Sequence, residues 1–195
     1  MKFKISLPVI LLLVLAVLII LVISNRIKEP HLAPAPSGGD FELQTNNGIF
    51  NLKEQRGKIV LIYFGYTYCP DICPTNLSHM AQALNELTEA ELARVEPVFI
   101  SVDPHRDSLE HLENYTRHFH HSIVGMTGDE EAVAKIAKQY GAAYQKVIGE
   151  SEGGYLMDHS SFTYLVDQDG QLTTSFLHAT HPQEMVDTIR TYLNK

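Results

Sequence analysis

Cysteine is scarce in this sequence: its 195 residues contain only two, Cys69 and Cys73. Two cysteines are too few for a fold stapled by disulfides, so the chain must rely on a hydrophobic core. Hydrophobic residues make up 45% of the chain. The length accommodates one domain of about 150 residues with an additional segment.

Basic residues are outnumbered as well. The chain has 15 Lys and Arg against 23 Asp and Glu, which gives a formal net charge of -8. Nucleic-acid binding depends on Lys and Arg side chains that neutralise phosphates. We therefore expect no nucleic-acid partner.

Charge is missing altogether from Ile5 to Ser24, a run made mostly of Leu, Val and Ile. About 20 apolar residues span a bilayer as a helix, whereas a signal peptide has an apolar region of about 7–15. We expect residues 1–28 to form a short cytoplasmic tail and an uncleaved transmembrane anchor. Lys and Arg are nearly balanced around it, so charge orients it only weakly. A short tail before a large domain is typical of an exported domain, which favours a single-pass inner-membrane protein with its domain on the oxidising periplasmic or equivalent face.

Residues 29–40 contain three prolines and Gly38-Gly39, a composition that predicts an extended tether. Residues 41–195 form the expected domain. Hydrophobic periodicity and turn signals predict its elements in chain order. The first half has a hairpin over 41–52 around an Asn-Gly turn, a strand at 59–64, a helix carrying 77–87, a strand at 95–102 and a helix over 109–119. The second half has a short strand at 123–126, a helix over 133–140, an irregular segment at 144–157 that can form a hairpin around 149–154, strands at 161–166 and 171–177, and a helix carrying 185–193.

Helix boundaries are marked by polar residues. Thr88 with Glu91, and Asp107 with Glu110, have the spacing of a capping box. Asp129 is expected to cap a helix that Gly141 ends. The alternation of strands and helices predicts a thioredoxin-like α/β fold, with a mixed sheet flanked by helices.

Cys69 and Cys73 directly follow the most strand-like run of the domain. A purely structural disulfide is disfavoured because the loop between them is minimal. A redox dithiol is open, although thioredoxin-like catalysts use C-x-x-C and this pair is C-x-x-x-C. Such catalysts also place a proline before the strand that faces the active site, and no proline occurs from Asp107 through His181. A metal site is the third option, because thiolates select Cu(I) or zinc. If the segment is helical, both sulfurs lie on one face.

A metal site needs at least one more ligand. His159 immediately precedes a predicted core strand, in a loop expected to face the cysteines. Six further histidines, at 79, 118, 120, 121, 178 and 181, are interpreted as solvated surface residues. The segment Asp103-Pro104-His105-Arg106-Asp107 follows the second buried strand. It is either a loop with a helix cap at Asp107 and an Arg106 ion pair, or a group of residues that orients the site or contacts a docking partner.

Three motifs together resemble the Sco/SenC family. They are Cys69-Pro70-Asp71-Ile72-Cys73-Pro74, the segment from Ser101 to Asp107, and Asp158-His159-Ser160 followed by a Tyr-Leu-Val-Asp run. The resemblance extends from about Phe41 to the C-terminus. It implies a membrane-anchored, thioredoxin-like copper-binding protein that serves assembly of the binuclear copper centre of cytochrome c oxidase. It also implies that Cys69, Cys73 and His159 are the copper ligands, with Asp103, Arg106, Asp107 and Asp158 orienting the site or contacting a partner.

Two thiolates and one imidazole suit trigonal Cu(I), or Cu(II) with an added oxygen ligand, whereas structural zinc favours four ligands. We therefore expect a metallochaperone, not primarily an enzyme, that delivers copper to the oxidase subunit bearing the binuclear site. A thiol–disulfide reductase that keeps the oxidase cysteines reduced is the alternative, with Cys69 and Cys73 as a redox disulfide. A peroxidase-like or signalling relative of the same fold is a third option. Another copper chaperone or a thioredoxin-like reductant is an expected further partner.

Overall fold

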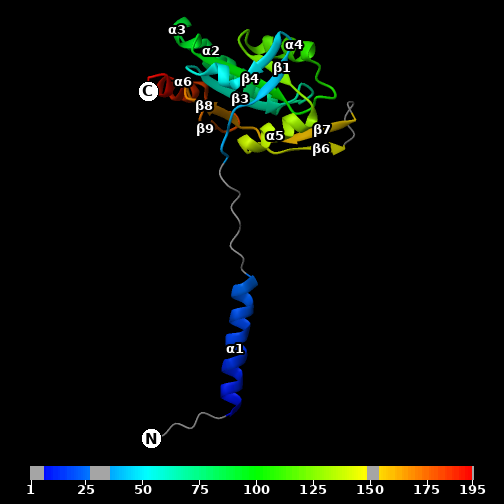
Figure 1. The fold of residues 1–195 in the computed structure, drawn as a ribbon, viewed down its shortest axis with the longest axis vertical. Coiled ribbons are helices and arrows are strands. Elements are labelled where there is room, and N and C mark those ends of the chain that lie inside the picture. The colour runs from blue at the N-terminus through cyan, green and yellow to red at the C-terminus, as the bar shows by residue number, and fades with distance from the viewer. Residues whose placement is uncertain (1–6, 27–35, 149–153, 195) are drawn as a thin grey trace. The chain divides into compact units, whose positions relative to one another are not determined.

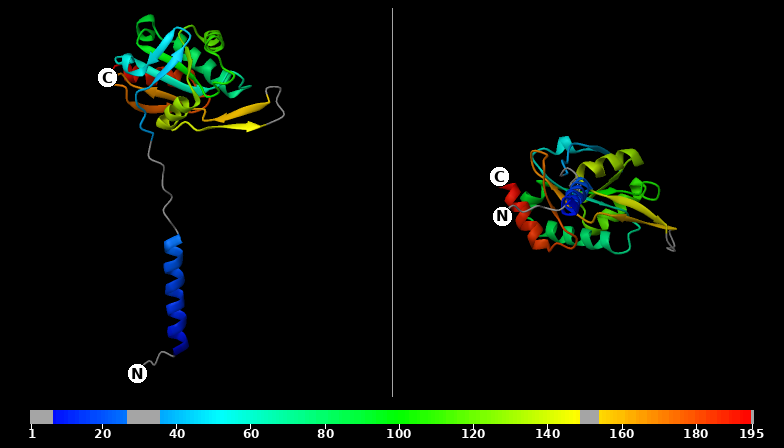
Figure 2. Two further views of the ribbon diagram at one scale, coloured as in Figure 1. Left: turned by 45° about the vertical axis from the view of Figure 1, so that its right-hand side comes forward. Right: turned by 90° about the horizontal axis from the view of Figure 1, so that it is seen from below.

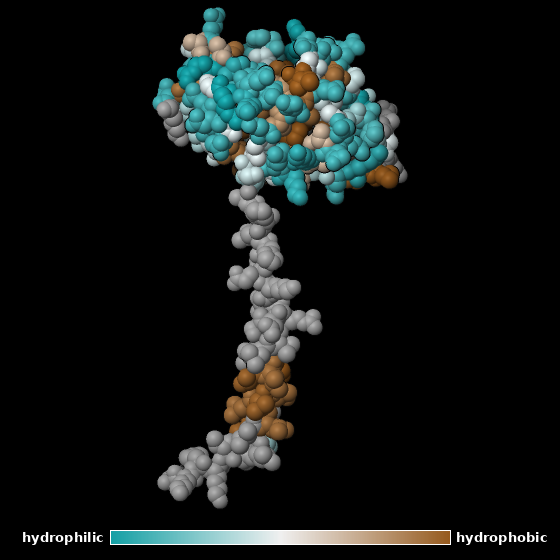
Figure 3. Space-filling view, viewed as in Figure 1, coloured by the Kyte–Doolittle hydropathy of each residue, from teal (hydrophilic) through white to brown (hydrophobic). Residues whose placement is uncertain are grey.

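The computed structural model describes residues 7–26, 36–148 and 154–194. Contacts divide the chain into two units, residues 1–35 and residues 36–195. The first unit contains helix α1 (Leu7–Arg26), whose described side chains are apolar and exposed (Figure 3). Within the described residues, no helix combines the length and the apolar character that crossing a bilayer requires. The anchor expected for residues 1–28 stays a prediction.

The second unit is built on a mixed sheet. Within its described residues the strand order is β2-β1-β5-β4-β3-β8-β9, and β6 and β7 form a separate two-stranded sheet (Figure 1). The strands are β1 (Glu42–Thr45), β2 (Gly48–Asn51), β3 (Ile59–Gly65), β4 (Val95–Ser101), β5 (Val124–Thr127), β6 (Tyr144–Ile148), β7 (Tyr155–His159), β8 (Thr163–Val166) and β9 (Leu172–Phe176). β3, β4 and β5 run parallel, while β1 and β8 pair antiparallel with their neighbours. This arrangement confirms the expected mixed α/β fold of the thioredoxin-like type.

β3 forms the centre of the core. All seven of its residues are buried, as its continuous apolar run predicts for a strand covered on both faces. Tyr63 packs beside Phe99 of β4, and its hydroxyl accepts a hydrogen bond from Asn76 of helix α2 (Ile72–Asn85). The next residue, Phe64, points the other way and contacts Tyr140 of helix α5 (Glu130–Tyr140). β3 therefore has one face toward α2 and the opposite face toward α5.

The helices cover the sheet from both sides. They are the 3-10 helix η1 (Leu52–Gln55) and the α-helices α2 (Ile72–Asn85), α3 (Glu89–Leu92), α4 (Leu109–Phe119), α5 (Glu130–Tyr140) and α6 (Pro182–Leu193). α2 contacts α4 and α6. Tyr115 of α4 also packs on Phe99, which places α4 on the same face of the sheet as α2. α5 covers the opposite face (Figures 1 and 2).

Most predicted helix ends are confirmed. Thr88 forms a capping box with Glu91, and Asp129 caps α5, which ends at Gly141 with a φ of 68°. The prediction that Asp107 caps a helix is wrong. Ser108 caps α4 instead, because its side chain accepts the N–H of His111, while the Asp107 carboxylate is buried and accepts hydrogen bonds from other segments.

The segment at 144–157 forms the expected hairpin, with β6 and β7 as its strands. Residues 149–153 lie outside the described residues. Tyr144 pairs with His159 and Ile148 with Tyr155. This ribbon extends away from the main sheet (Figure 2). Its base carries His159, so the hairpin determines where the imidazole lies.

Candidate metal centre

The two cysteines lie where β3 passes into α2. Cys69 precedes the helix, which begins at Ile72, so the pair does not share one face of a continuous helix. Cys73 is in the first helical turn and its backbone N–H donates to Cys69 Sγ at 3.4 Å. The side chain of the N-cap residue, Asp71, makes no capping hydrogen bond. The Cys69 sulfur therefore satisfies an N–H group that a capping side chain usually satisfies.

His159 ends β7 and is held at its backbone by neighbouring segments. The N–H of Ser160 donates to the Ala143 carbonyl at 2.8 Å, and the Ala143 N–H donates to Ser160 Oγ at 2.9 Å. The imidazole Nδ1 lies 3.0 Å from the Ser160 carbonyl, which requires Nδ1 to carry the proton. Nε2 therefore keeps its lone pair, and it is this atom that points at the cysteines.

The ligand atoms of Cys69, Cys73 and His159 all lie within 4.8 Å of one another. Cys73 Sγ and His159 Nε2 are 3.3 Å apart. A trigonal ion with bonds of about 2.0–2.3 Å requires donors about 3.5–4 Å apart, so small side-chain adjustments would accommodate one ion. Within the described residues no other group of His, Cys, Asp or Glu gathers in this way.

Burial differs among the three side chains. Cys73 is fully buried, whereas Cys69 and His159 are partly exposed. The rings of Tyr63 and Tyr66 approach the imidazole edge-on, with centroids 6.1 and 5.8 Å from that of His159. The tyrosines enclose the buried side of the site, and one edge stays open to solvent.

The two thiols share one negative charge. The hydrogen bond from the Cys73 thiol lowers the pKa of Cys69 below its usual value, helped by the backbone N–H groups of Cys73 and Asp71. Burial raises the pKa of Cys73, and the hydrogen bond to Cys69 and the Cys69 charge raise it further. These opposite pKa shifts favour a Cys69 thiolate beside a Cys73 thiol. A metal ion that binds both sulfurs must displace the Cys73 proton.

Gly65, the last residue of β3, makes room for the buried sulfur. A Cβ at this position would lie 2.7 Å from Cys73 Sγ, 2.9 Å from a Phe99 ring carbon and 3.1 Å from a Tyr63 ring carbon. Sequence reasoning missed this residue, although a glycine inside a strand pattern is a known signal of close approach.

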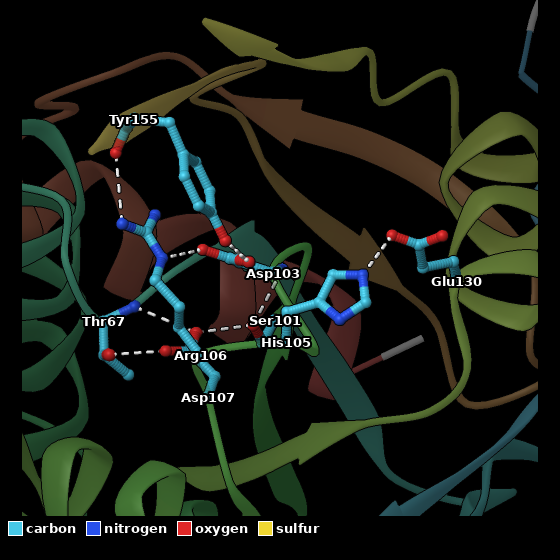
Figure 4. Close-up of polar contacts among 8 residues, drawn as sticks. All are labelled: Thr67, Ser101, Asp103, His105, Arg106, Asp107, Glu130 and Tyr155. Carbon is cyan, nitrogen blue, oxygen red and sulfur yellow. Dashed lines mark hydrogen bonds and ion pairs between the residues drawn. The ribbon is translucent and has the colours of Figure 1, made fainter. Parts of the chain in front are cut away.

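Asp103 and Arg106 connect the cysteine loop to the histidine-bearing hairpin (Figure 4). Arg106 Nε pairs with Asp103 Oδ2 at 2.5 Å, and its Nη1 donates to the Tyr155 carbonyl at 3.1 Å. The Tyr155 hydroxyl donates to Asp103 Oδ1 at 2.7 Å. The guanidinium carbon lies 3.6 Å from the ring centre of Tyr155 and 4.7 Å from that of Tyr68. Arg106 thus joins the residue before Cys69 to β7, the strand of His159. The predicted Arg106 ion pair is present.

Asp107 also contacts the start of the cysteine loop, as well as the end of β4. It accepts hydrogen bonds from the backbone N–H of Thr67 at 3.1 Å and the Thr67 hydroxyl at 2.5 Å, and from the Ser101 hydroxyl at 2.6 Å (Figure 4). Because Thr67 lies two residues before Cys69, these contacts fix the start of the cysteine loop.

Asp158 is exposed on β7, and Gln145 donates to its carboxylate at 3.5 Å. The prediction of a site-orienting or docking role for Asp158 therefore rests on the sequence alone. Most other histidines lie elsewhere on the fold. His105 pairs with Glu130 at the surface, and His79 contacts the Thr180 carbonyl. The interpretation of His120 as a solvated residue is wrong: it is buried, and it contacts the Ser122 hydroxyl.

Two thiols and an imidazole at the end of the central strand define a thioredoxin-like protein with a centre for a soft metal or for thiol redox chemistry. Comparison with known proteins narrows this class. A family model described as SCO1/SenC matches residues 29–194. The SCO2-like protein RC0895 of Rickettsia conorii is 41% identical over 155 residues, which are 78% of this chain and 75% of that protein. The chain therefore belongs to the SCO1/SenC family.

Solved structures of Sco proteins also resemble this chain. ScoI of Bradyrhizobium japonicum, solved with copper bound, is 37% identical with a TM-score of 0.73, over 80% of this chain and 99% of that one. Yeast Sco1 with copper bound is 36% identical with a TM-score of 0.72, over 83% of this chain and 90% of that one.

Proposed function

We propose that this protein is a copper metallochaperone that binds one copper ion through Cys69, Cys73 and His159 and transfers it to a partner. The gathering of two sulfurs and one imidazole nitrogen within 4.8 Å carries the proposal. This donor set is soft and has three members, which favours Cu(I). The copper-bound structures of the relatives from Bradyrhizobium japonicum and yeast support it.

Copper is the cargo of this site, and the unequal burial of its ligands suits capture and release. The Cys69 thiolate is charged and partly exposed, so it meets the ion first. Cys73 then loses its proton, and His159 contributes the Nε2 lone pair. During transfer, ligands of the partner reach the ion from the open side and replace His159 or Cys69. The buried Cys73 is the last ligand to release the ion.

The recipient we propose is the cytochrome c oxidase subunit that bears the binuclear copper site, as the family resemblance implies. We further propose that residues 1–28 tether the domain to the outer face of a membrane, an idea supported by the uncharged run from Ile5 to Ser24. Alkaline extraction of membranes separates the two states: a tethered chain stays with the lipid, and release into the extract would contradict the tether.

Copper titration of the reduced full-length chain tests the proposal. One equivalent of Cu(I) should bind, and Cys69→Ser, Cys73→Ser and His159→Ala should each weaken binding. His118→Ala, at an exposed histidine on α4, is the matched control and should bind like the wild type. Unchanged binding in the three ligand variants would contradict the proposal.

The residues around the ligands enter the proposal as positioning groups. We assign Asp103, Arg106 and Asp107 the role of fixing the cysteine loop relative to β7, and Asp158 the role of a docking contact. Arg106→Lys keeps the charge beside Asp103 but loses the planar group between Tyr68 and Tyr155. It should weaken copper binding, whereas Arg190→Lys, at an ion pair with Glu91, should not. Equal copper affinity in the two variants would remove Arg106 from the site.

A thiol–disulfide reductase is the second candidate, and one observation favours it: both cysteines are free. The lowered pKa of Cys69 suits the attacking thiolate of such a reductase. That thiolate would attack a partner disulfide to form a mixed disulfide, and Cys73 would resolve it. The partner leaves as a dithiol, and a Cys69–Cys73 disulfide remains for a thioredoxin-like reductant to reduce. Turnover of a disulfide substrate that does not depend on His159 would favour the reductase, and tight copper binding without turnover would favour the chaperone.

A further inference from the structure

The ribbon of β6 and β7, which carries His159, is a sheet of its own. Within the described residues its two strands pair with each other and not with the seven-stranded sheet. Five consecutive residue pairs, from Tyr144 with His159 to Ile148 with Tyr155, hold the strands in one register. On β7 the first, third and fifth residues are half-buried, and the two between them are exposed. One face of β7 therefore lies against the domain, and Tyr155 and His159 share that face.

Tyr155 attaches this face to the domain at the other end of β7 from His159. Its hydroxyl donates to Asp103 Oδ1 at 2.7 Å, and its carbonyl accepts from Arg106 Nη1 at 3.1 Å (Figure 4). Two cations lie over its ring: the Arg106 guanidinium carbon is 3.6 Å from the ring centre, and Lys146 Nζ is 3.7 Å from it. Both the side chain and the backbone of Tyr155 are thus held.

The Asp103 carboxylate is a fixed anchor for this hydroxyl. The Asp103 side chain is 3% exposed, and its second oxygen pairs with Arg106 Nε at 2.5 Å. Its backbone N–H donates to Ser101 Oγ at 3.0 Å, and its carbonyl accepts the Asp107 N–H at 3.1 Å. Because β4 ends at Ser101, the Tyr155 hydroxyl is connected to the end of a central strand.

The length of β7 makes this contact a constraint on the direction of the strand. Tyr155 and His159 are the first and last residues of β7, which places them about 13 Å apart at about 3.3 Å per residue. An O–H···O hydrogen bond tolerates about 0.5 Å of displacement. Over that length, 0.5 Å corresponds to a tilt of about 2°. A functional site needs its groups within about 10–20° of the productive geometry, so the contact is stiff enough to define where the imidazole points.

We propose that Tyr155 is a positioning residue for copper binding, which acts through His159. Its hydroxyl fixes the ribbon against Asp103, so that Nε2 of His159 faces the two sulfurs before the ion arrives. This inference rests on the proposed copper function. It differs from the role assigned to Arg106, because the hydroxyl contact does not involve the cysteine loop.

A double-mutant cycle tests whether Tyr155 acts through His159. The four chains are the full-length wild type, Tyr155→Phe, His159→Ala and the double variant. Tyr155→Phe removes only the hydroxyl and keeps the ring beside Arg106. Tyr140→Phe is the control, because it also removes one hydroxyl hydrogen bond, to the Gly39 carbonyl at 3.0 Å, away from the sulfurs. Competition with a chelator measures the Cu(I) affinity of the reduced chains, and thermal unfolding without copper measures stability separately.

Tyr155→Phe should weaken Cu(I) binding about tenfold, the lower end of the usual effect of removing a group that orients a ligand. Tyr140→Phe should bind like the wild type. In the His159→Ala background the Tyr155 substitution should have no further effect, because the ligand that it positions is gone. An equal loss in both backgrounds, or an unchanged affinity of Tyr155→Phe, would overturn the inference while the copper function stands. If His159→Ala itself binds Cu(I) as tightly as the wild type, the proposed three-ligand site fails, and the inference fails with it.

Discussion

Gly65→Ala is the sharpest probe of the packing behind the metal centre. The added methyl would meet three side chains, of Cys73, Phe99 and Tyr63, that are each fully buried. Gly65 is not among the glycines with positive φ, so the cost is steric and not conformational. Overpacking of this kind costs about 1–3 kcal/mol. For a domain of this size that predicts a fall in Tm of about 2–12 °C.

The effect on copper should exceed what lost stability explains. The two rings are held on all sides, so Cys73 Sγ, at the end of a single rotatable bond, is the atom that moves most easily. Rotation of this bond changes the distance from Cys73 Sγ to His159 Nε2, which is 3.3 Å in the native site. We expect Cu(I) affinity to fall about 10–100-fold, as for other changes that misplace a ligand.

Competition titration with a Cu(I) chelator measures this affinity, and thermal unfolding of the copper-free chain measures stability. Gly125→Ala is the matched control, because a Cβ there would lie 2.9 Å from the Leu112 backbone, remote from the sulfurs. It should lose stability and keep its copper affinity. If Gly65→Ala binds Cu(I) as tightly as Gly125→Ala, the argument that Gly65 holds the sulfur in place is refuted.

Three further outcomes are expected. Asp107→Asn should lower stability by about 2–4 kcal/mol, because it weakens charge-assisted hydrogen bonds inside the protein. Thermal unfolding measures this, Glu110→Gln in the exposed first turn of α4 is the control, and equal Tm values would contradict it. Cu(I) affinity should rise about tenfold per pH unit between about pH 6 and 8, because burial keeps Cys73 protonated and copper must displace that proton. An affinity that does not change with pH in a buffered competition assay would mean that no proton is released. Oxidising Cys69 and Cys73 to a disulfide should abolish tight Cu(I) binding, because the proposed ligands are the two thiolates. Equal affinity of the oxidised and reduced chains would rule this out.

Sequence signals between neighbouring residues were enough to predict most elements of the fold. The apolar run of β3, the capping box at Thr88 and the glycine after α5 each depend on residues close in the chain, so the sequence pattern predicts them. Asp107 shows the limit of such signals. Its spacing from Glu110 favours a cap, but the hydroxyls of Thr67 and Ser101 offer its carboxylate buried partners, and Ser108 takes over the cap.

The candidate metal centre, too, was predictable from the sequence only in part. Residue type, spacing and order along the chain were enough to select Cys69, Cys73 and His159, because soft ligands are rare in this sequence and each follows or precedes a predicted core strand. Their distances, their unequal burial and the groups behind them came only from the tertiary structure. Gly65 has no chemistry that marks it in a sequence. It matters because β3, β4 and α2 meet at one point, where Cys73, Phe99 and Tyr63 lie close to it, and such contacts between distant segments are decided by packing of the whole domain.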